Sequence, residues 1–457
     1  MSVTPPIAAS TSSDLRAVLR SGLSKSLVSL FIKVATAGLT YGMYVVLSRA
    51  MSEAEYGYFA FGLSLATVLA IGASMGQHTA ILRFWQEETV AQRPEKALAA
   101  LRAGGALSIL AGLGVGLGLM LVATILALFG PAAAPVAHLF AAALLVLPMA
   151  LAEFWSSALR AQGSVWTALV PRDIVWRVAA PLVVVGVTLA GAPVNGWQAL
   201  AITALTLAAA LALQYGLAGR RYQIAPGFAE MGGYWAERGG ASRWFLIGTV
   251  MDSAALNMDT IFVALLVAPE VAGVYFNAFR TAGLLTLFMF AITLVVAPMV
   301  ARHYHAGEMR KAQAVTALCA WAGFVFSAAV FVLFWFFGEQ VLSLFGGTQQ
   351  DGWIILIILS VGLLFDAATG PSRIVMMMTG HELAYVRIFG GVVLASFALQ
   401  LIVIPLFGVI GAALVTTGAR IVAQLAIAWW SRRHIGLDTT LLGAFLVRRM
   451  VDAPTVR

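Results

Sequence analysis

The chain has 457 residues, of which 61% are hydrophobic and 11% charged, and its formal net charge is +8. Soluble proteins contain about 45–50% apolar and about 25% charged residues, so this composition excludes an ordinary soluble domain. The single cysteine, Cys319, excludes an intramolecular disulfide framework.

Residues 1–13 are rich in Ser, Thr and Pro, which predicts a disordered segment, and residues 1–26 are expected to form a tail on the cytoplasmic side. Apolar runs of about 20 residues, the length a helix needs to cross the hydrocarbon core, then recur along the chain. We predict twelve transmembrane helices, at 27–48, 56–77, 103–129, 136–158, 171–190, 196–218, 244–267, 273–298, 314–337, 353–374, 385–405 and 408–430. The first run has no small-residue cleavage site, so we interpret it as a retained helix.

The basic residues indicate how these helices are oriented. With a cytoplasmic amino terminus, 24 of the 28 Lys and Arg residues fall on the cytoplasmic side and Arg49 falls on the outer side. Lys33, Arg280 and Arg420 fall inside predicted helices. This asymmetry agrees with the positive-inside rule and predicts that both termini are cytoplasmic. Because topology accounts for the basic charge, we expect no nucleic-acid partner.

The helix pattern divides the chain into an N-lobe at 27–218 and a C-lobe at 244–430, joined by a cytoplasmic linker at 219–243. The carboxyl-terminal tail, 431–457, is expected to be cytoplasmic. Its stretch 437–450 mixes apolar residues with Arg448 and Arg449, which is typical of an amphipathic helix on the inner leaflet. No predicted loop is long enough for a folded domain, so we expect the function to reside within the bilayer.

Two pairs of similar turns indicate an internal repeat. Gly57 and Gly273 follow the first and seventh predicted helices and are 216 residues apart, while Gly163 and Gly380 are 217 apart. Because each half has an even number of helices, both halves enter the membrane in the same orientation. The sequence therefore predicts an all-α integral membrane protein with two six-helix lobes, related by a parallel pseudo-two-fold repeat around a central cavity.

Three stretches resemble a known family. Residues 47–57 (LSRAMSEAEYG) are similar to the pattern after the first helix of polysaccharide flippases in the multidrug/oligosaccharidyl-lipid/polysaccharide exporter superfamily. Asp259 followed by 270–275 (EVAGVY) resembles that family's seventh helix and its turn. Residues 404–413 (IPLFGVIGAA) resemble its last helical hairpin.

The resemblance implies a non-enzymatic transporter of the bacterial inner membrane. Its cargo would be a polyprenyl-pyrophosphate-linked oligosaccharide, an O-antigen or exopolysaccharide repeat unit, moved by alternating access. Membrane lipids, and the glycosyltransferases and polymerase of the same pathway, are the implied partners. No cofactor is expected, and the chain lacks a Gly-rich phosphate loop ending in Gly-Lys-Ser/Thr.

Ionisable residues inside the predicted helices are the candidate site. An ionisable group at a helix centre costs about 2.5–3.5 kcal/mol on insertion scales, so each should face a cavity or a partner. Lys33, Arg280 and Arg420 are the candidates for binding the cargo, because a cation, and above all an arginine fork, fits phosphate oxygens. The alternative is that these cations pair with carboxylates between helices.

The acidic candidates are Asp252, Asp259 and Asp366. Asp252 and Asp259 are seven apart and share one stripe of the seventh helix. These carboxylates are candidates for carrying a coupling proton or for forming ion pairs. Pro371 lacks a backbone donor and is a candidate hinge. His303 and His305 lack a further ligand, so no metal site is expected.

Two other functions stay open on the sequence. A cation-coupled drug or metabolite exporter of the same superfamily would use an acidic cavity around Asp252, Asp259 and Asp366. A membrane polysaccharide polymerase or glycosyltransferase would need a sizeable extramembrane loop, which the short predicted loops do not provide.

Overall fold

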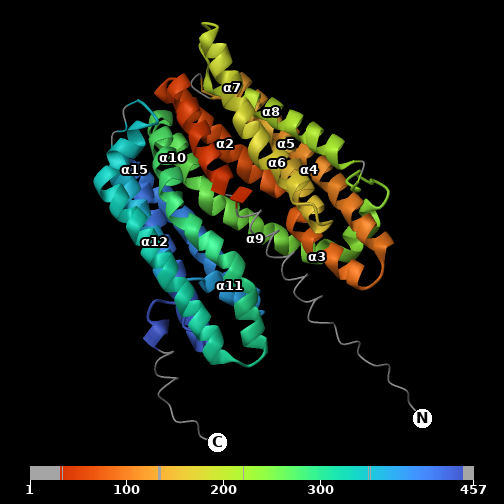
Figure 1. Cartoon of the computed structure of the whole chain (residues 1–457). Helices are drawn as coiled ribbons and strands as arrows, with labels where there is room; N and C mark the ends of the chain where they lie inside the picture. The colour runs from red at the N-terminus through yellow and green to blue at the C-terminus, as the bar shows by residue number, and fades with distance from the viewer. Residues whose placement is uncertain are drawn as a thin grey trace, which may run out of the picture.

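The computed structural model describes residues 31–445, apart from Lys33, residues 132–134, Arg220, Thr348 and Gln350. These residues form helices and connecting turns (Figure 1). After a helix that reaches residue 50, the elements are α2 (Glu53–Ala73), α3 (Gln77–Val90), α4 (Pro94–Phe129), α5 (Val136–Ala161), α6 (Trp166–Val170), the π-turn η1 (Pro171–Val175), α7 (Trp176–Leu189), α8 (Gly196–Ala218), α9 (Met231–Leu266), α10 (Pro269–Ala282), the 3₁₀ turn η2 (Gly283–Thr286), α11 (Leu287–His305), α12 (Met309–Ser343), α13 (Gly352–Ala368), α14 (Ser372–Met378) and α15 (Glu382–His434).

Helix boundaries follow local sequence signals. The Ser52 side chain accepts a hydrogen bond from the Glu55 amide at the start of α2, as an N-cap should. Pro269 begins α10, where its missing N–H is one that no helix would use. Gly76, with φ +71°, separates α2 from α3.

Eight of the described helices are long and apolar enough to cross a membrane, and nine if α13 and α14 form one span bent by 43°. Large apolar side chains such as Leu117 and Leu205 lie exposed on their surfaces, as lipid contact requires. The prediction of an all-α membrane protein is therefore confirmed.

The count differs from twelve for identifiable reasons. α15 runs through both of the last two predicted spans, with non-helical angles at Gly408 (φ 61°, ψ −149°) between them. The fifth predicted span is divided by η1, and the first begins before the described residues. Hydropathy alone does not show these features, because it reads two apolar runs where α15 is one element and one apolar run where η1 and α7 are two.

The helices form two bundles that meet at one end (Figure 1). The N-terminal bundle contains the helix reaching residue 50 and α2–α8, and the C-terminal bundle contains α10–α15. At the meeting end the repeated turns touch: a Cβ atom added to Gly57 would lie 1.7 Å from the Pro269 carbonyl oxygen, and one on Gly273 would lie 3.4 Å from Gly57 Cα. Glycine is required at residue 57 because the backbones approach so closely.

α9 links the bundles. It begins at Met231, within the stretch 219–243 expected to be a linker. The first turns of α9 bind the N-terminal bundle, where Tyr234 OH donates to Gln77 Oε1 at 2.7 Å and Arg238 pairs with Glu88. The second half contacts α15 of the C-terminal bundle. One continuous helix therefore belongs to both bundles.

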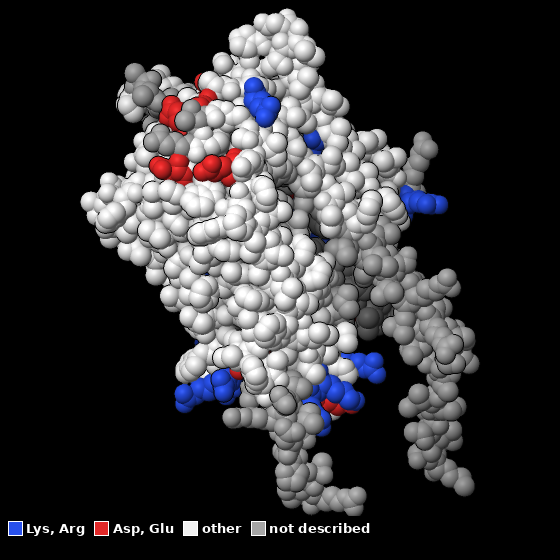
Figure 2. Space-filling view, turned by 60° about the vertical axis from the view of Figure 1, so that its left-hand side comes forward, with Lys and Arg blue, Asp and Glu red and all other residues white. Residues whose placement is uncertain are grey.

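Charge is distributed unevenly along the molecule. On the face shown in Figure 2, most of the acidic side chains lie near the end where the bundles meet, beside a few basic ones, and further basic side chains gather at the other end. A broad band between them shows almost no charge. The exposed acidic residues at the meeting end include Glu53, Glu270, Glu339 and Asp351.

The carboxyl-terminal segment was expected to form an amphipathic helix over residues 437–450. Residues 436–442 are not helical, and residues 446–450 lie outside the described residues.

Candidate functional site

A cavity of about 600 Å³ opens in the C-terminal bundle. Its walls come from α9, η2, α11, α13, α14 and α15 and from the turn between α13 and α14. Five of the residues expected to be functional line it: Asp252, Asp259, Asp366, Pro371 and Arg420. The fold therefore brings together charges that the sequence placed on three separate helices.

Asp259 is buried, with 4% of its surface exposed, and neutral groups hold it. Gln400 donates to its Oδ1 at 2.7 Å, and Thr416 and Tyr275 donate to its Oδ2 at 2.7 and 2.8 Å. Among the described residues, Asp259 has no ion-pair partner. Three hydrogen bonds satisfy the carboxylate without neutralising it.

The other two carboxylates of the cavity form ion pairs. Asp252 Oδ2 lies 2.7 Å from Arg373 Nη2, which joins α9 to α14. Asp366 Oδ2 lies 3.4 Å from Arg420 Nη1, which joins α13 to α15. Three carboxylates therefore face two arginines, so the cavity is slightly acidic rather than cationic.

Arg280 lies outside this cavity. Its Nη2 donates to Asn257 Oδ1 at 2.9 Å, and its guanidinium carbon sits 4.8 Å from the centre of the Phe276 ring. Its Nε is buried without a hydrogen-bond partner in the structure. No carboxylate among the described residues pairs with Arg280, whereas Lys33 lies outside the described residues.

Pro371 lies at the break between α13 and α14, where the axis bends by 43°. Because proline has no N–H, the Ala367 carbonyl instead accepts from the Gly370 amide at 3.1 Å. The Ser372 amide donates to the Gly370 carbonyl at 2.8 Å. The break is therefore stabilised by local turns, and the hinge at Pro371 stays a prediction.

A second charged cluster lies in the N-terminal bundle and was missed by the sequence reasoning. Arg172 pairs with Glu153 and lies 3.6 Å from Asp173, and Arg177 lies 3.7 Å from Asp173. Glu153, Arg172, Trp176 and Arg177 line a small cavity of about 60 Å³. The orientation argument had counted both arginines as cytoplasmic markers. The sequence does contain an indication of this cluster, because Asp173 and Arg177 are four residues apart within an apolar stretch, the spacing of an ion pair on one helix face.

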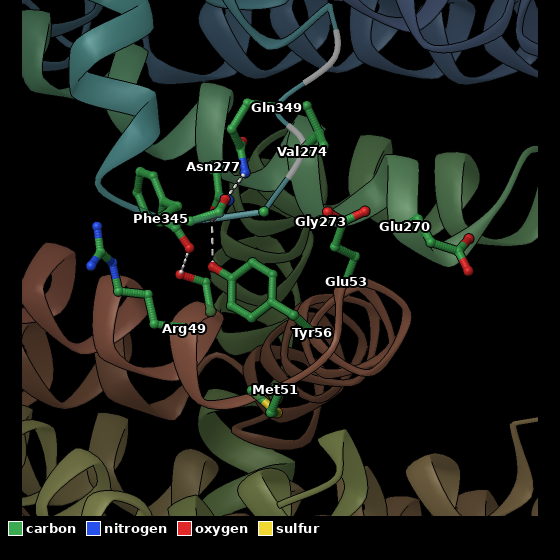
Figure 3. Close-up of a pocket in the computed structure, with 13 residues that line it drawn as sticks. Arg49, Met51, Glu53, Tyr56, Glu270, Gly273, Val274, Asn277, Phe345 and Gln349 are labelled. Atoms are coloured by element: carbon green, nitrogen blue, oxygen red, sulfur yellow. Dashed lines mark hydrogen bonds between the residues drawn. The ribbon is translucent and has the colours of Figure 1, made fainter.

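A third pocket, of about 430 Å³, lies where the bundles meet (Figure 3). Around it Tyr56 OH donates to Asn277 Oδ1 at 2.6 Å, Ser48 Oγ donates to the Phe345 carbonyl at 2.8 Å, and Arg49 Nε donates to the Leu344 carbonyl at 2.6 Å. Each bond joins one bundle to the other. We call this contact the seam, and it joins the two bundles at one end.

No group of three or more His, Cys, Asp or Glu side chains with metal-binding geometry occurs in the described part of the chain. His303 Nδ1 lies 2.6 Å from a carboxylate oxygen of Glu308. Lys311 also donates to Glu308, at 2.8 Å. These two donors hold the pKa of the Glu308 carboxyl below its ordinary value.

Two family models match the sequence of this chain. The sequence model of a family described as polysaccharide biosynthesis protein matches residues 23–304, and the MatE model matches residues 246–389. No curated protein matches the chain.

Solved structures share the fold at low sequence identity. An inward-facing multidrug resistance MATE family transporter of the MOP superfamily is 14% identical, with a TM-score of 0.67 over 94% of this chain and 100% of that chain. An outward-facing structure of such a transporter gives 0.59 at 14% identity, over 94% and 96%. A MOP superfamily transporter from Pyrococcus furiosus gives 0.61 at 14% identity, over 91% and 95%.

Proposed function

Because this chain belongs to the polysaccharide biosynthesis protein family, we propose that it moves a polyprenyl-pyrophosphate-linked oligosaccharide across the bacterial inner membrane by alternating access. The family match over residues 23–304 carries this proposal. The chain is a transporter and not an enzyme, so the polymerase and glycosyltransferase alternatives are set aside.

The proposed topology has twelve crossings in two six-helix lobes, with both termini cytoplasmic. In support, the two glycines of the internal repeat, Gly57 and Gly273, pack against each other between the bundles. The gathering of acidic side chains near the seam and of basic side chains at the opposite end in Figure 2, apart from a few basic groups near the seam, also supports an outer end at the seam. In this topology the seam closes the outer side, and cargo would enter from the cytoplasm.

Arg280 is our first choice for the pyrophosphate. Its charge meets only an amide and aromatic rings in the described residues, so an anion would not have to displace a carboxylate. Arg420 is already held by Asp366 and would have to exchange partners. Lys33 stays a candidate on sequence grounds. An oligosaccharide of an O-antigen or exopolysaccharide repeat unit would extend from this anchor.

The proposed partners follow from the cargo. The polyprenyl chain would stay in the lipid, beside the exposed apolar side chains of the bundles. The glycan would be made by cytoplasmic glycosyltransferases and consumed by a polymerase on the outer side, so these enzymes are the expected neighbours in the pathway.

A cation-coupled exporter of the same superfamily is the second candidate, and one observation favours it. Asp259 accepts three hydrogen bonds but has no cationic partner among the described residues. A proton or metal cation could therefore bind there without breaking an ion pair. Cation coupling at Asp259 would be compatible with transport of a lipid-linked oligosaccharide and with transport of a drug or metabolite. An assay of transport therefore has to distinguish the two cargoes.

The test uses purified full-length protein in liposomes containing a fluorescent polyprenyl-pyrophosphate oligosaccharide. Protection of the glycan from an added glycosidase reports transfer between leaflets. We expect transfer with the wild-type protein, at least about tenfold less with Arg280→Ala, and intermediate transfer with Arg280→Lys, since lysine keeps the charge but loses the arginine fork. Transfer no faster than in protein-free liposomes, together with export of a cationic dye, would establish the second candidate instead.

A further inference from the structure

The chain turns back on itself after its last helix. Gly436, with φ +79°, redirects the backbone, and residues 436–445, here called the strap, return to the C-terminal bundle. The Leu437 side chain is fully buried and packs in a cluster with Val300 of α11, Cys319 of α12 and Met376 of α14. The strap is therefore part of the folded bundle.

One glutamine of α12 clamps the strap. Gln313 Nε2 donates to the Asp438 carbonyl at 2.7 Å, and the Asp438 amide donates to Gln313 Oε1 at 2.8 Å. Gln313 Nε2 also lies 3.3 Å from the Gly443 carbonyl. The side-chain amide thus imitates a neighbouring peptide group, and its partners are buried.

The strap supplies a hydrogen bond that the break between α13 and α14 lacks. In a continuous helix the Ala368 carbonyl would accept from the Ser372 amide, but that amide bonds to the Gly370 carbonyl. The Leu441 amide of the strap takes its place, donating to the Ala368 carbonyl at 3.0 Å. Thr439 Oγ1 adds a bond to Ser372 Oγ at 3.2 Å.

The fit at the break is tight. Gly370 has φ +65°, and a Cβ added there would lie 2.3 Å from the Thr439 carbonyl oxygen and 2.7 Å from Ala320 Cβ. The strap, α12 and the break are thus in van der Waals contact, and no room is left between them for a side chain at residue 370.

The opposite side of the same break faces the 600 Å³ cavity. Asp366 precedes the break and pairs with Arg420, while Arg373 follows it and pairs with Asp252. The angle between α13 and α14 therefore sets the separation of Asp366 and Arg373, which are one member of each ion pair. A contact that sets this angle from outside also sets the shape of the cavity.

We propose that the strap is a brace that holds the bend between α13 and α14 and thereby keeps Arg373 on Asp252. Loosening the strap lets α14 move and frees the Arg373–Asp252 pair. The effect on the bend stands on the contacts alone, and only its consequence for transport rests on the proposed function.

The N-terminal bundle provides a matched control. Gln162 clamps the segment after α8 in the same way: its Nε2 donates to the Gln223 carbonyl and its Oε1 accepts from the Gln223 amide, both at 3.1 Å. This second clamp does not touch α13 or α14. Replacing Gln162 removes the same kind of bonds without disturbing the break.

The test is hydrogen–deuterium exchange on the full-length protein in detergent, comparing wild type with Gln313→Met, Leu437→Ala and Gln162→Met. Gln313→Met keeps the side-chain length and removes the clamp, and Leu437→Ala loosens the packing without touching the break. We expect peptides covering residues 366–380 to exchange about tenfold faster in both strap variants, since local opening sets exchange. Gln162→Met should leave these peptides unchanged.

The same variants are then assayed for transfer of the lipid-linked glycan, where both strap variants should be at least about fivefold slower than Gln162→Met. Faster exchange confined to residues 436–445, with 366–380 unchanged, overturns the brace. Faster exchange at 366–380 with normal transfer overturns its role in transport. Exchange needs no cargo, so an inactive wild type would contradict the proposed function while the exchange result still decides on the brace.

Discussion

Gly57 and Gly273 occupy matching positions in the two halves of the chain and lie against each other, with a Cβ on Gly273 falling 3.4 Å from Gly57 Cα. The glycine pair lets α2 and α10 approach at the seam more closely than any other residues would allow. The internal repeat seen in the sequence is therefore also a physical contact, and it lies beside the bonds that close the seam.

Gly57→Ala should force the seam apart. Its methyl group would lie 1.7 Å from the Pro269 carbonyl oxygen, and overpacking of this kind costs about 1–3 kcal/mol. Thermal unfolding in detergent measures the loss. Gly216→Ala, an exposed helical position with nothing within 4 Å, is the control and should be neutral or slightly stabilising. Equal behaviour of the two variants would contradict the close approach.

Tyr56→Phe should weaken the seam with little change of shape. It removes the hydrogen bond to Asn277 and leaves that buried amide oxygen without its donor, which costs about 1–3 kcal/mol. We expect lower thermal stability and faster labelling, from the outer side, of a cysteine placed at Val274 in the seam pocket. Tyr58→Phe, whose ring stacks on His138, is the control. Unchanged labelling in Tyr56→Phe would show that this bond does not hold the seam.

Asp259→Asn should separate coupling from folding. Asparagine keeps the size of the side chain, and the Thr416 and Tyr275 hydroxyls can rotate to accept from its amide. We expect a folded protein whose transfer rate no longer depends on pH or on sodium. Ser396→Ala, in the same cavity, should keep the wild-type dependence. A mutant that keeps this dependence would exclude Asp259 as the coupling site.

Glu153→Gln should destabilise the N-terminal bundle through Arg172. Breaking a buried pair by removing one partner costs about 3–5 kcal/mol. Both side chains here are partly exposed, at 28% and 17%, so a smaller loss of about 1–3 kcal/mol is expected. The double variant Glu153→Gln/Arg172→Gln should recover part of the loss. Additive losses in unfolding measurements would show that the pair is not coupled.

The sequence predicted the features that depend on composition and periodicity. The apolar runs indicated a helical membrane protein, and the rule that buried charges need partners identified Asp252, Asp366 and Arg420 as notable. The structure confirms the membrane fold and places these residues in one cavity. Which cation meets which carboxylate depends on how α9, α13 and α15 pack, and no spacing in the sequence contains that information.

The misses have a common physical cause. Span boundaries drawn from hydropathy treat a charge near a boundary as a loop charge, so Arg172 and Arg177 were assigned to the cytoplasmic side. The π-turn η1 and the partners Glu153 and Asp173 hold both arginines within the bundle, and a count of loop charges does not predict these partners. Arg373, which pairs with Asp252, was missed in the same way. The strap was also not visible, because its contacts are made largely by backbone groups.

α9 has a mechanical consequence for the whole molecule. One end of this rod is anchored to α3 through Arg238 and Tyr234, and the other end carries Asp252 and Asp259 into the cavity of the C-terminal bundle. α9 also packs against α2 of the N-terminal bundle, so any movement of one bundle relative to the other must change the contacts of α9 with α2 or with α15. The ion pair of Asp252 and the hydrogen bonds of Asp259 would therefore respond to a movement of either bundle.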